Sequence, residues 1–312
     1  MQPKFSWIQM GSTALCAALL LGGLQAQAPA KQKPAPPKDV SAPAQDTQPA
    51  FKALIFPSKD GLALRADFYA PHKDPKTPLI VLFHQADWSR GEYLAIAPRL
   101  NRMGFNCLAL DQRSGNAVNG IVNETAKRAK ASKLPTEYVD AKQDMEAALA
   151  YARKQLTTGT LLAWGSSYSA ALVLQIAGEQ PLSVDGVLAF APGEYFNTRG
   201  KNWIAKSAAG IQVPVFITSA KSEEKNWMGI FDSIKSLRKT RFLPKTEGNH
   251  GSRALWRKFK DSPEYWVAVS AFLQDFLPKI KHESSEKNPG STPVNPETPK
   301  KRPAPVKKPR VQ

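Results

Sequence analysis

One short stretch constrains the fold of this chain more than any other. Residues 160–164 form an apolar run of strand type, residues 168–174 have helical spacing, and the junction between them reads Gly-x-Ser-x-Ser around Ser167. A strand that turns directly into a helix holds the central residue in a tight, strained turn, and small neighbours let other backbone approach it. The Ser167 hydroxyl then stands clear of the sheet, with the positive end of a helix behind it. The stretch therefore predicts an accessible serine nucleophile at the end of a buried strand.

The body of the chain, residues 51–277, alternates between strand-like and helix-like segments, and Asp60-Gly61 is a hairpin signal near its start. Strands are predicted at 51–56, 62–69, 78–84, around Cys107, and at 160–164, 184–190, 213–219 and 241–243; helices are predicted at 92–103, 138–155, from 168 onward, and at 231–237 and 263–276. Residues 112–135 form a polar segment between these elements. The alternation predicts an α/β fold with a mostly parallel sheet, antiparallel at its start and covered on both faces.

The junction around Ser167 resembles the nucleophile elbow of the α/β-hydrolase family, although Ser169 stands where the family has a second glycine. The runs Asp-Gln-Arg-Ser-Gly at 111–115 and Pro-Gly-Glu-Tyr-Phe at 192–196 look like those of dienelactone-hydrolase-like bacterial proteins. The resemblance covers the whole body of the chain. It implies an α/β-hydrolase fold without a large cap domain, because only residues 194–212 are available for a lid.

The same resemblance implies a catalytic histidine, because the family keeps the order serine, acid, histidine along the chain. His72 and His84 precede the serine, and His282 lies in the C-terminal tail. His250 lies in a glycine-flanked loop after the last short strand, where the family carries its base. Position and elimination therefore both select His250.

The catalytic acid is less sharply defined. In the family it follows the proline of the preceding strand by about nine residues, and that spacing from Pro214 leads to Glu223. Family members more often use Asp here, and this loop contains none. Glu194, which follows the previous strand, and Glu224, which is adjacent to Glu223, stay open as alternatives in that order.

An oxyanion site needs two backbone N–H groups close to the nucleophile. The residue after the nucleophile, Tyr168, supplies one of them by the family pattern. The second comes from the loop after the third strand, which often begins His-Gly-x in relatives. That match selects Ala86, with Gln85 as the alternative, and Gln85 departs from the pattern because it replaces the glycine.

Together these residues predict a serine hydrolase that cleaves carboxylic esters or thioesters of small molecules through an acyl-enzyme. A peptidase on the same fold and a non-catalytic envelope-binding protein on a hydrolase scaffold are the alternatives. No cofactor and no metal are expected, because the sequence has no Cys/His cluster or closely spaced histidine pair. Five aromatic residues are candidates to line the site: Trp88, Tyr195, Phe196, Trp203 and Trp227.

The two ends of the chain differ from its body. Residues 1–30 have the Lys4 start, short apolar stretch and small residues of a secretory signal peptide, and residues 31–50 read as a Pro/Ala-rich linker. Residues 278–312 read as a disordered, basic, Pro-rich tail. We therefore expect a secreted or periplasmic protein in which Cys107, a buried small hydrophobe, is the single remaining cysteine.

The positive charge is spread along the chain rather than confined to the tail. Nine Lys and Arg against three Glu give residues 278–312 a net +6, and four Lys against two Asp give residues 1–50 a net +2. The remaining +9 of the total +17 lies on the body. No nucleic-acid recognition motif accompanies this charge, so no nucleic-acid partner is expected. Weak contact between the tail and an anionic envelope surface is the one macromolecular contact that the charge suggests, and the sequence leaves the oligomeric state open.

Overall fold

The computed structural model describes residues 50–278. The predicted signal peptide, linker and tail lie outside this range apart from Ala50 and Pro278, so the predicted domain boundaries stay predictions. Within the described range, no helix combines the length and the apolar character that crossing a membrane requires.

An eight-stranded sheet forms the centre of the described chain, in the order β1-β2-β4-β3-β7-β8-β9-β10. The first two strands form an antiparallel hairpin, β2 runs antiparallel to β4, and the remaining neighbours are parallel. The strands are β1 Lys52–Pro57, β2 Ala63–Tyr69, β3 Leu79–Phe83, β4 Asn106–Leu110, β7 Leu161–Ser166, β8 Gly186–Phe190, β9 Val215–Thr218 and β10 Lys239–Phe242. The predicted α/β class with an antiparallel start is thus confirmed.

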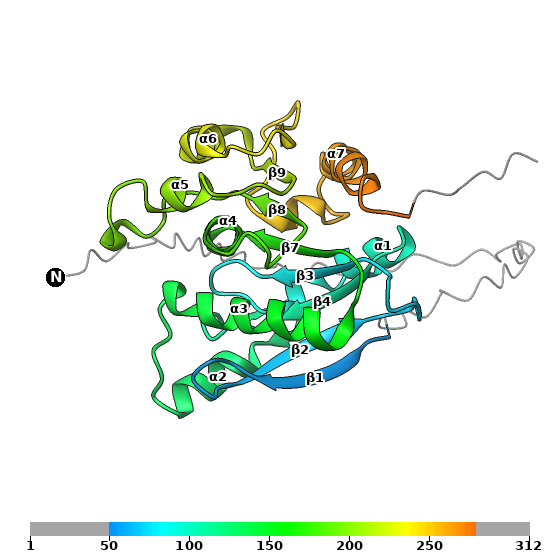
Figure 1. Ribbon diagram of the computed structural model, residues 1–312, viewed down its shortest axis with the longest axis vertical. Helices are drawn as coiled ribbons and strands as arrows, with labels where there is room; N and C mark the ends of the chain where they lie inside the picture. Colours follow the sequence, from blue (N-terminus) through cyan, green and yellow to red (C-terminus); the bar gives the residue numbers. More distant parts are fainter. Residues whose placement is uncertain (1–49, 279–312) are drawn as a thin grey trace, which may run out of the picture. The chain divides into compact units, whose positions relative to one another are not determined.

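Helices cover both faces of this sheet (Figure 1). They are α1 Ile96–Arg102, α2 Glu124–Ala131, α3 Lys142–Tyr151, α4 Tyr168–Glu179, α5 Trp203–Ala208, α6 Glu224–Ser233 and α7 Ser262–Gln274. Apolar residues of α2 to α6 pack together against one face, whereas those of α1 and α7 pack against the other. The central strands β3, β4, β7 and β8 are buried along their whole length. Their continuous apolar runs are those of strands covered on both faces.

The segment predicted as polar, residues 112–135, holds more structure than its composition indicates. It contains α2 and a small hairpin of β5 Ala117–Val118 and β6 Ile121–Val122. The buried side of α2 consists of small side chains, among them Ala126 and Ala129. Because alanines contribute little to a hydrophobic pattern, the periodicity of this helix does not stand out in the sequence.

Two helices begin at other residues than predicted. The helix predicted at 92–103 is a 3-10 turn over Arg90–Tyr93 followed by α1. The helix predicted at 231–237 was wrong in position, because α6 ends at Ser233 and Ile234 is extended. The charged start of α6 reads as a loop in sequence, but Trp227 and Ile230, three residues apart, bury one face of it.

Buried ion pairs fix the loops at the carboxyl ends of the strands. Arg90, after β3, pairs with Asp67 at 3.0 Å and with Asp111 at 2.5 Å. Arg113, after β4, is fully buried and pairs with Asp144 of α3 at 2.7 Å. Such pairs cost desolvation, and breaking one leaves a buried charge unpaired. They therefore hold the loops around the carboxyl edge in one arrangement.

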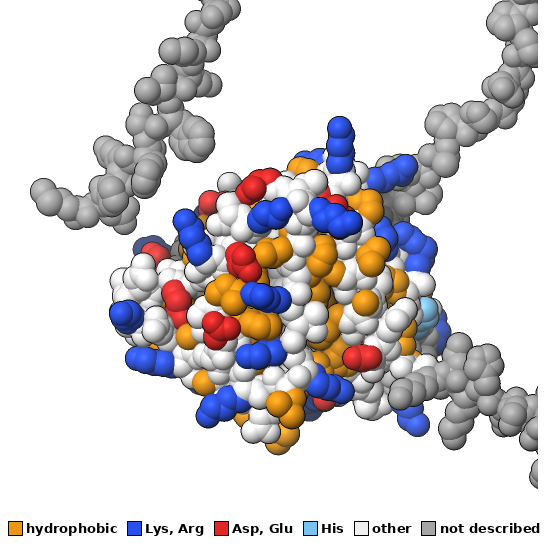
Figure 2. Space-filling model, turned by 90° about the horizontal axis from the view of Figure 1, so that it is seen from above, with side chains coloured by type: hydrophobic (Ala, Val, Ile, Leu, Met, Phe, Trp, Pro, Cys, Tyr) orange, Lys and Arg blue, Asp and Glu red, His pale blue; other side chains and the backbone are white. Residues whose placement is uncertain are grey.

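Cys107 is fully buried in β4, as predicted, and burial raises the pKa of its thiol. The surface charge is mixed: Figure 2 shows Lys and Arg side chains scattered over one face of the molecule, with Asp and Glu between them. On that face the positive charge does not gather into a single basic patch.

Candidate active site

Ser167 lies between the last residue of β7 and the first residue of α4. Its backbone has φ 58° and ψ −122°, a conformation that side-chain-bearing residues rarely adopt. Gly165 permits this turn, because a Cβ there would lie 2.4 Å from the carbonyl oxygen of Ser169 and 2.6 Å from the Cα of Ala170. The sharp strand-to-helix turn expected from the sequence is therefore present.

Ser169 explains how the turn tolerates a serine in place of the second glycine. Its side chain is fully buried, but its hydroxyl donates to the carbonyl oxygen of His84 at 2.6 Å. The same hydroxyl accepts a hydrogen bond from Nε2 of Gln112, also at 2.6 Å. Because both contacts are satisfied, the extra hydroxyl is accommodated without an unpaired buried polar group.

The structure brings Ser167, His250 and Glu223 together from three separate loops. Nε2 of His250 lies 2.8 Å from Oγ of Ser167, and Nδ1 of His250 lies 2.5 Å from Oε1 of Glu223. The second oxygen of Glu223 accepts the N–H of Ala220 at 3.1 Å, which orients the carboxylate. This arrangement can take a proton from a serine hydroxyl and stabilise the resulting imidazolium.

The two alternative acids have other contacts. Glu194 accepts hydrogen bonds from the N–H groups of Ile204 and Ala205, at 2.9 and 2.8 Å, and so caps the start of α5. Glu224 pairs with Arg241 at 3.2 Å on the surface. Within residues 50–278, neither carboxylate makes a hydrogen bond to His250, so the geometry selects Glu223 among the three.

His84 is not an alternative to His250 as the catalytic base. His84 is fully buried, and burial lowers its pKa to about 4. Its Nδ1 lies 2.8 Å from the carbonyl oxygen of Gln85, and its Nε2 accepts the N–H of Gln112 at 3.2 Å. His84 is therefore a neutral side chain that supports the loop after β3.

The predicted oxyanion donors lie at the ends of neighbouring strands. Phe83 of β3 is opposite Gly165 of β7, and Ala86 and Tyr168 each follow three residues later. In the described part of the chain, neither of these two N–H groups donates to another protein group. The alternative donor Gln85 is not free, because its N–H donates to Oε2 of Glu92 at 2.8 Å. The pair Ala86 and Tyr168 therefore fits an oxyanion site, whereas Gln85 does not.

Two buried polar residues next to this site, Glu92 and Ser166, were not among the residues predicted from the sequence. Glu92 is fully buried, and burial raises the pKa of its carboxyl to about 7. Its Oε1 accepts the hydroxyl of Ser166, the residue before the candidate nucleophile, at 2.7 Å. In the sequence Glu92 is a charged residue at the start of the helix predicted at 92–103, and nothing there signals its burial.

A cavity of about 650 Å³ opens beside the elbow. Tyr168 and Tyr138, whose rings lie 4.7 Å apart, form part of its wall, and Tyr195 and Phe196 form another part. The hydroxyl of Tyr195 donates to the carbonyl oxygen of Ala191 at 2.7 Å. Partial desolvation of its hydroxyl, together with the nearby charge of Glu223, raises the pKa of Tyr195 to about 12. The cavity thus combines four aromatic side chains with charged residues, among them Glu137, Asp140 and Arg199.

The other three candidate aromatic residues do not line this cavity. Trp203 packs edge-on against Phe196, with ring centres 5.6 Å apart. Trp227 is fully buried and belongs to the core. Trp88 stacks on Trp256 at 5.2 Å. Of the five predicted aromatic residues, Tyr195 and Phe196 are therefore the two in contact with the cavity.

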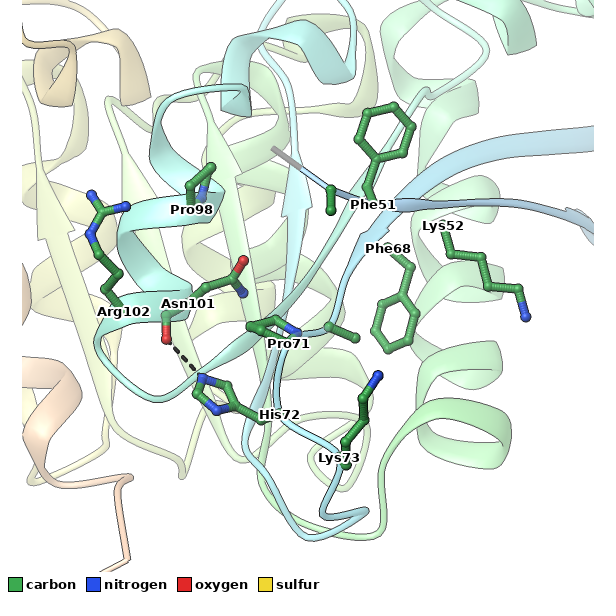
Figure 3. A pocket seen from close by; sticks show the side chains of 11 residues that line it. Phe51, Lys52, Phe68, Pro71, His72, Lys73, Pro98, Asn101 and Arg102 are labelled. Atoms are coloured by element: carbon green, nitrogen blue, oxygen red, sulfur yellow. Dashed lines mark hydrogen bonds between the residues drawn. The ribbon is translucent and has the colours of Figure 1, made fainter. Parts of the chain in front are cut away.

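A larger cavity, of about 790 Å³, lies at the other edge of the sheet (Figure 3). Its lining comes from the start of β1, the end of β2 and the end of α1, and includes Phe51, Phe68 and Arg102. His72 also lines it, and its Nε2 lies 2.8 Å from the carbonyl oxygen of Asn101. Ser167 lies at the opposite, carboxyl edge, so this cavity is separate from the candidate active site.

Comparisons with known proteins extend the description of the fold. No protein-family model matches the chain, and no curated protein matches its sequence. Solved structures do match. A dienelactone hydrolase from Anabaena variabilis superposes with a TM-score of 0.57 at 13% sequence identity, over 74% of this chain and 100% of that enzyme.

Two esterases give similar values. An esterase from Pyrococcus furiosus matches with a TM-score of 0.55 at 16% identity, over 73% of this chain and 93% of the esterase. The protein Est1E from Butyrivibrio proteoclasticus, solved with ferulic acid bound, matches with a TM-score of 0.53 at 13% identity, over 72% of this chain and 99% of Est1E. At these identities the similarity concerns the fold, and it confirms the resemblance expected from the sequence: the chain has the α/β-hydrolase fold, with dienelactone hydrolase and esterases among its structural neighbours.

Proposed function

We propose that the chain is a serine hydrolase that cleaves carboxylic esters or thioesters through an acyl-enzyme. The observation that carries the proposal is the continuous set of hydrogen bonds from Ser167 through His250 to Glu223. The strained turn at Ser167 and the two N–H groups of Ala86 and Tyr168 support the same reading. Structural neighbours that are hydrolases and esterases agree with it.

The proposed reaction follows from the roles of these groups. His250 takes the proton of the Ser167 hydroxyl while the serine oxygen attacks the carbonyl carbon of the ester, and Glu223 stabilises the imidazolium that forms. The N–H groups of Ala86 and Tyr168 stabilise the negative oxygen of the tetrahedral intermediate. His250 then donates its proton to the leaving alcohol or thiol. A water activated by the same histidine releases the acid from the serine.

The aromatic part of the cavity beside Ser167 favours a substrate with a flat, ring-bearing group. Tyr138 and Tyr168 on one part of the wall, and Tyr195 and Phe196 on another, offer aromatic surface to such a group. A volume of about 650 Å³ accommodates a substituted ring and a short linker. The neighbour Est1E was solved with ferulic acid, an aromatic acid, which is consistent with this choice.

A screen of chromogenic esters, thioesters and peptides tests the proposal in the wild type and in Ser167→Ala. We expect hydrolysis of esters or thioesters by the wild type, faster for aromatic than for short aliphatic acyl groups, and no hydrolysis by Ser167→Ala. Ser132→Ala, which removes an exposed hydroxyl after α2, is the matched control and should keep full activity. Cleavage of peptides alone would favour the peptidase alternative. If the wild type hydrolyses none of the substrates and does not react with phosphonate probes, the binding-protein alternative is favoured.

We also propose that the protein is exported, on the sequence of residues 1–30. Cleavage is expected between Ala26 and Ala30. N-terminal sequencing of the native protein tests this, and a mature chain that still begins at Met1 would contradict it.

A further inference from the structure

We propose that Glu92 is a positioning residue for the reaction: its buried carboxylate joins the loop after β3, the elbow and the histidine loop into one unit. The inference rests on the proposed function, because it assigns a role in a reaction at Ser167. Within the described residues, Glu92 makes no hydrogen bond to Ser167 or His250. It therefore acts through neighbouring residues.

The carboxylate contacts each of the three segments. Its Oε2 accepts the N–H of Gln85 in the loop after β3, at 2.8 Å. Its Oε1 accepts the hydroxyl of Ser166, the last residue before the elbow, at 2.7 Å. The oxygen of Ser166 in turn accepts the N–H of Ser252, two residues after His250, at 2.8 Å. One carboxylate therefore contacts the oxyanion loop and the residue before the nucleophile directly, and the histidine loop through the hydroxyl of Ser166.

The contact with Gln85 determines which N–H of the loop is left for an oxyanion. A buried N–H needs an acceptor, and Glu92 supplies it for Gln85. The next N–H, that of Ala86, is left without a protein acceptor within residues 50–278. If the carboxylate were removed, the N–H of Gln85 would need a new partner. The loop would then lose the contact that keeps Ala86 as the donor.

The contact with Ser166 fixes the position of the loop that carries His250. Gly251, next to His250, has φ 68°, and a Cβ there would lie 2.6 Å from Oγ of Ser166 and 2.9 Å from Oε1 of Gln85. The loop is thus in close contact with Ser166 and Gln85, the two residues to which Glu92 is hydrogen-bonded. Since displacements of about 1 Å in a catalytic constellation can slow a reaction by about 100-fold, this support is expected to matter for rate.

The ionised form of Glu92 suits this role, because it accepts both hydrogen bonds at once. A protonated carboxyl has to donate one hydrogen, which reverses the bond to Ser166 or breaks the bond to Gln85. Two charged or titratable groups face it: Arg253 of the histidine loop, which favours the ionised form, and Tyr93, its own neighbour. Burial acts against ionisation and raises the pKa to about 7.

The test measures how fast an alkyl phosphonate probe labels Ser167, expressed per mole of folded protein. We expect Glu92→Ala to slow labelling by about 100-fold. Glu92→Gln should slow it much less, because its amide oxygen still accepts from Gln85 and its amide nitrogen can donate to Ser166. Glu146→Gln, a partly exposed carboxylate on α3, is the matched control and should label like the wild type.

Ser166→Ala keeps the proposal falsifiable if Glu92→Ala does not fold. This variant removes the hydroxyl that connects Glu92 to the N–H of Ser252, so it should also slow labelling. The double variant with Glu92→Ala should label little more slowly than either single variant, because both changes break the same connection. In steady-state kinetics the loss should lie in kcat, with KM almost unchanged. Folded Glu92→Ala or Ser166→Ala proteins that label at the wild-type rate would overturn the inference. A wild type that the probe does not label would instead overturn the proposed function itself.

Discussion

The two edges of the sheet hold cavities of similar size but of different chemistry. The cavity at the amino edge is the larger, about 790 Å³ against about 650 Å³, and its charged lining residues are the cations Lys52, Lys73 and Arg102. The cavity at the carboxyl edge adjoins a serine in a strained turn, a histidine and a carboxylate within hydrogen-bonding distance of one another. Cavity size alone would therefore select the edge that lacks this set of residues.

The difference has a topological origin. In a parallel sheet, each strand runs into its following loop at the carboxyl edge, so residues far apart in sequence meet there. Ser167, Glu223 and His250 follow β7, β9 and β10 in this way. At the amino edge, the loops return from helices and the antiparallel hairpin adds the end of β2. Convergent polar groups, rather than empty volume, distinguish the carboxyl edge.

The largest expected effect is the loss of the base at the carboxyl edge. His250→Ala should lower turnover by about 10³-fold or more, because the serine hydroxyl then has no acceptor for its proton. Adding Ser167→Ala should lower turnover little further, since the two residues act as one unit. Steady-state kinetics on the best ester of the screen measure both. A double variant whose loss equals the product of the two single losses would argue against a shared unit.

The next effect separates Glu223 from Glu194, the first of its two alternatives as the acid. Glu223→Ala should lower turnover by a smaller factor than His250→Ala, because the carboxylate orients the imidazole and does not itself transfer a proton. Glu194→Ala should leave turnover close to wild type but lower the free energy of unfolding by about 1 kcal/mol, since it uncaps α5. Kinetics and urea denaturation of both variants provide the comparison. The reverse pattern, with turnover lost in Glu194→Ala, would move the acid to the preceding strand.

A weaker, pH-dependent effect is expected on stability at the carboxyl edge. Burial raises the pKa of Glu92 from 4.5 to about 7 in the folded protein, so between these values the folded chain binds more protons than the unfolded chain. The contribution of Glu92 to the free energy of unfolding is therefore highest below pH 4.5 and declines as pH rises through 7. Urea denaturation of the wild type and Glu92→Gln at pH 5 and pH 8 measures it. The difference in stability should shift in favour of Glu92→Gln at pH 8, and a shift the other way would contradict the burial argument.

The sequence predicts the candidate catalytic residues at the carboxyl edge better than it predicts the buried contacts that support them. The elbow around Ser167 is a local pattern, and the order of Ser, Glu and His is preserved along the chain, so both can be read without coordinates. Glu92 and Ser166 act through contacts to segments as far away as Ser252. No local pattern records such contacts, because burial of a polar side chain depends on which segments the fold brings over it. The helix α2 was missed for a related reason, since its buried face is built from small residues.

The smallest effect is expected at the amino edge, where His72 offers a counterpart to His250. His72→Ala removes the hydrogen bond between Nε2 and the carbonyl oxygen of Asn101, and should lower the free energy of unfolding by about 1 kcal/mol. Its backbone contacts with Asn106 do not depend on the side chain and should persist. Turnover should stay within twofold of the wild type on every substrate that Ser167→Ala fails to cleave. A turnover loss at His72 that approaches the loss at His250, in a protein of unchanged stability, would mean that the larger cavity takes part in the reaction and that the two edges are not chemically distinct.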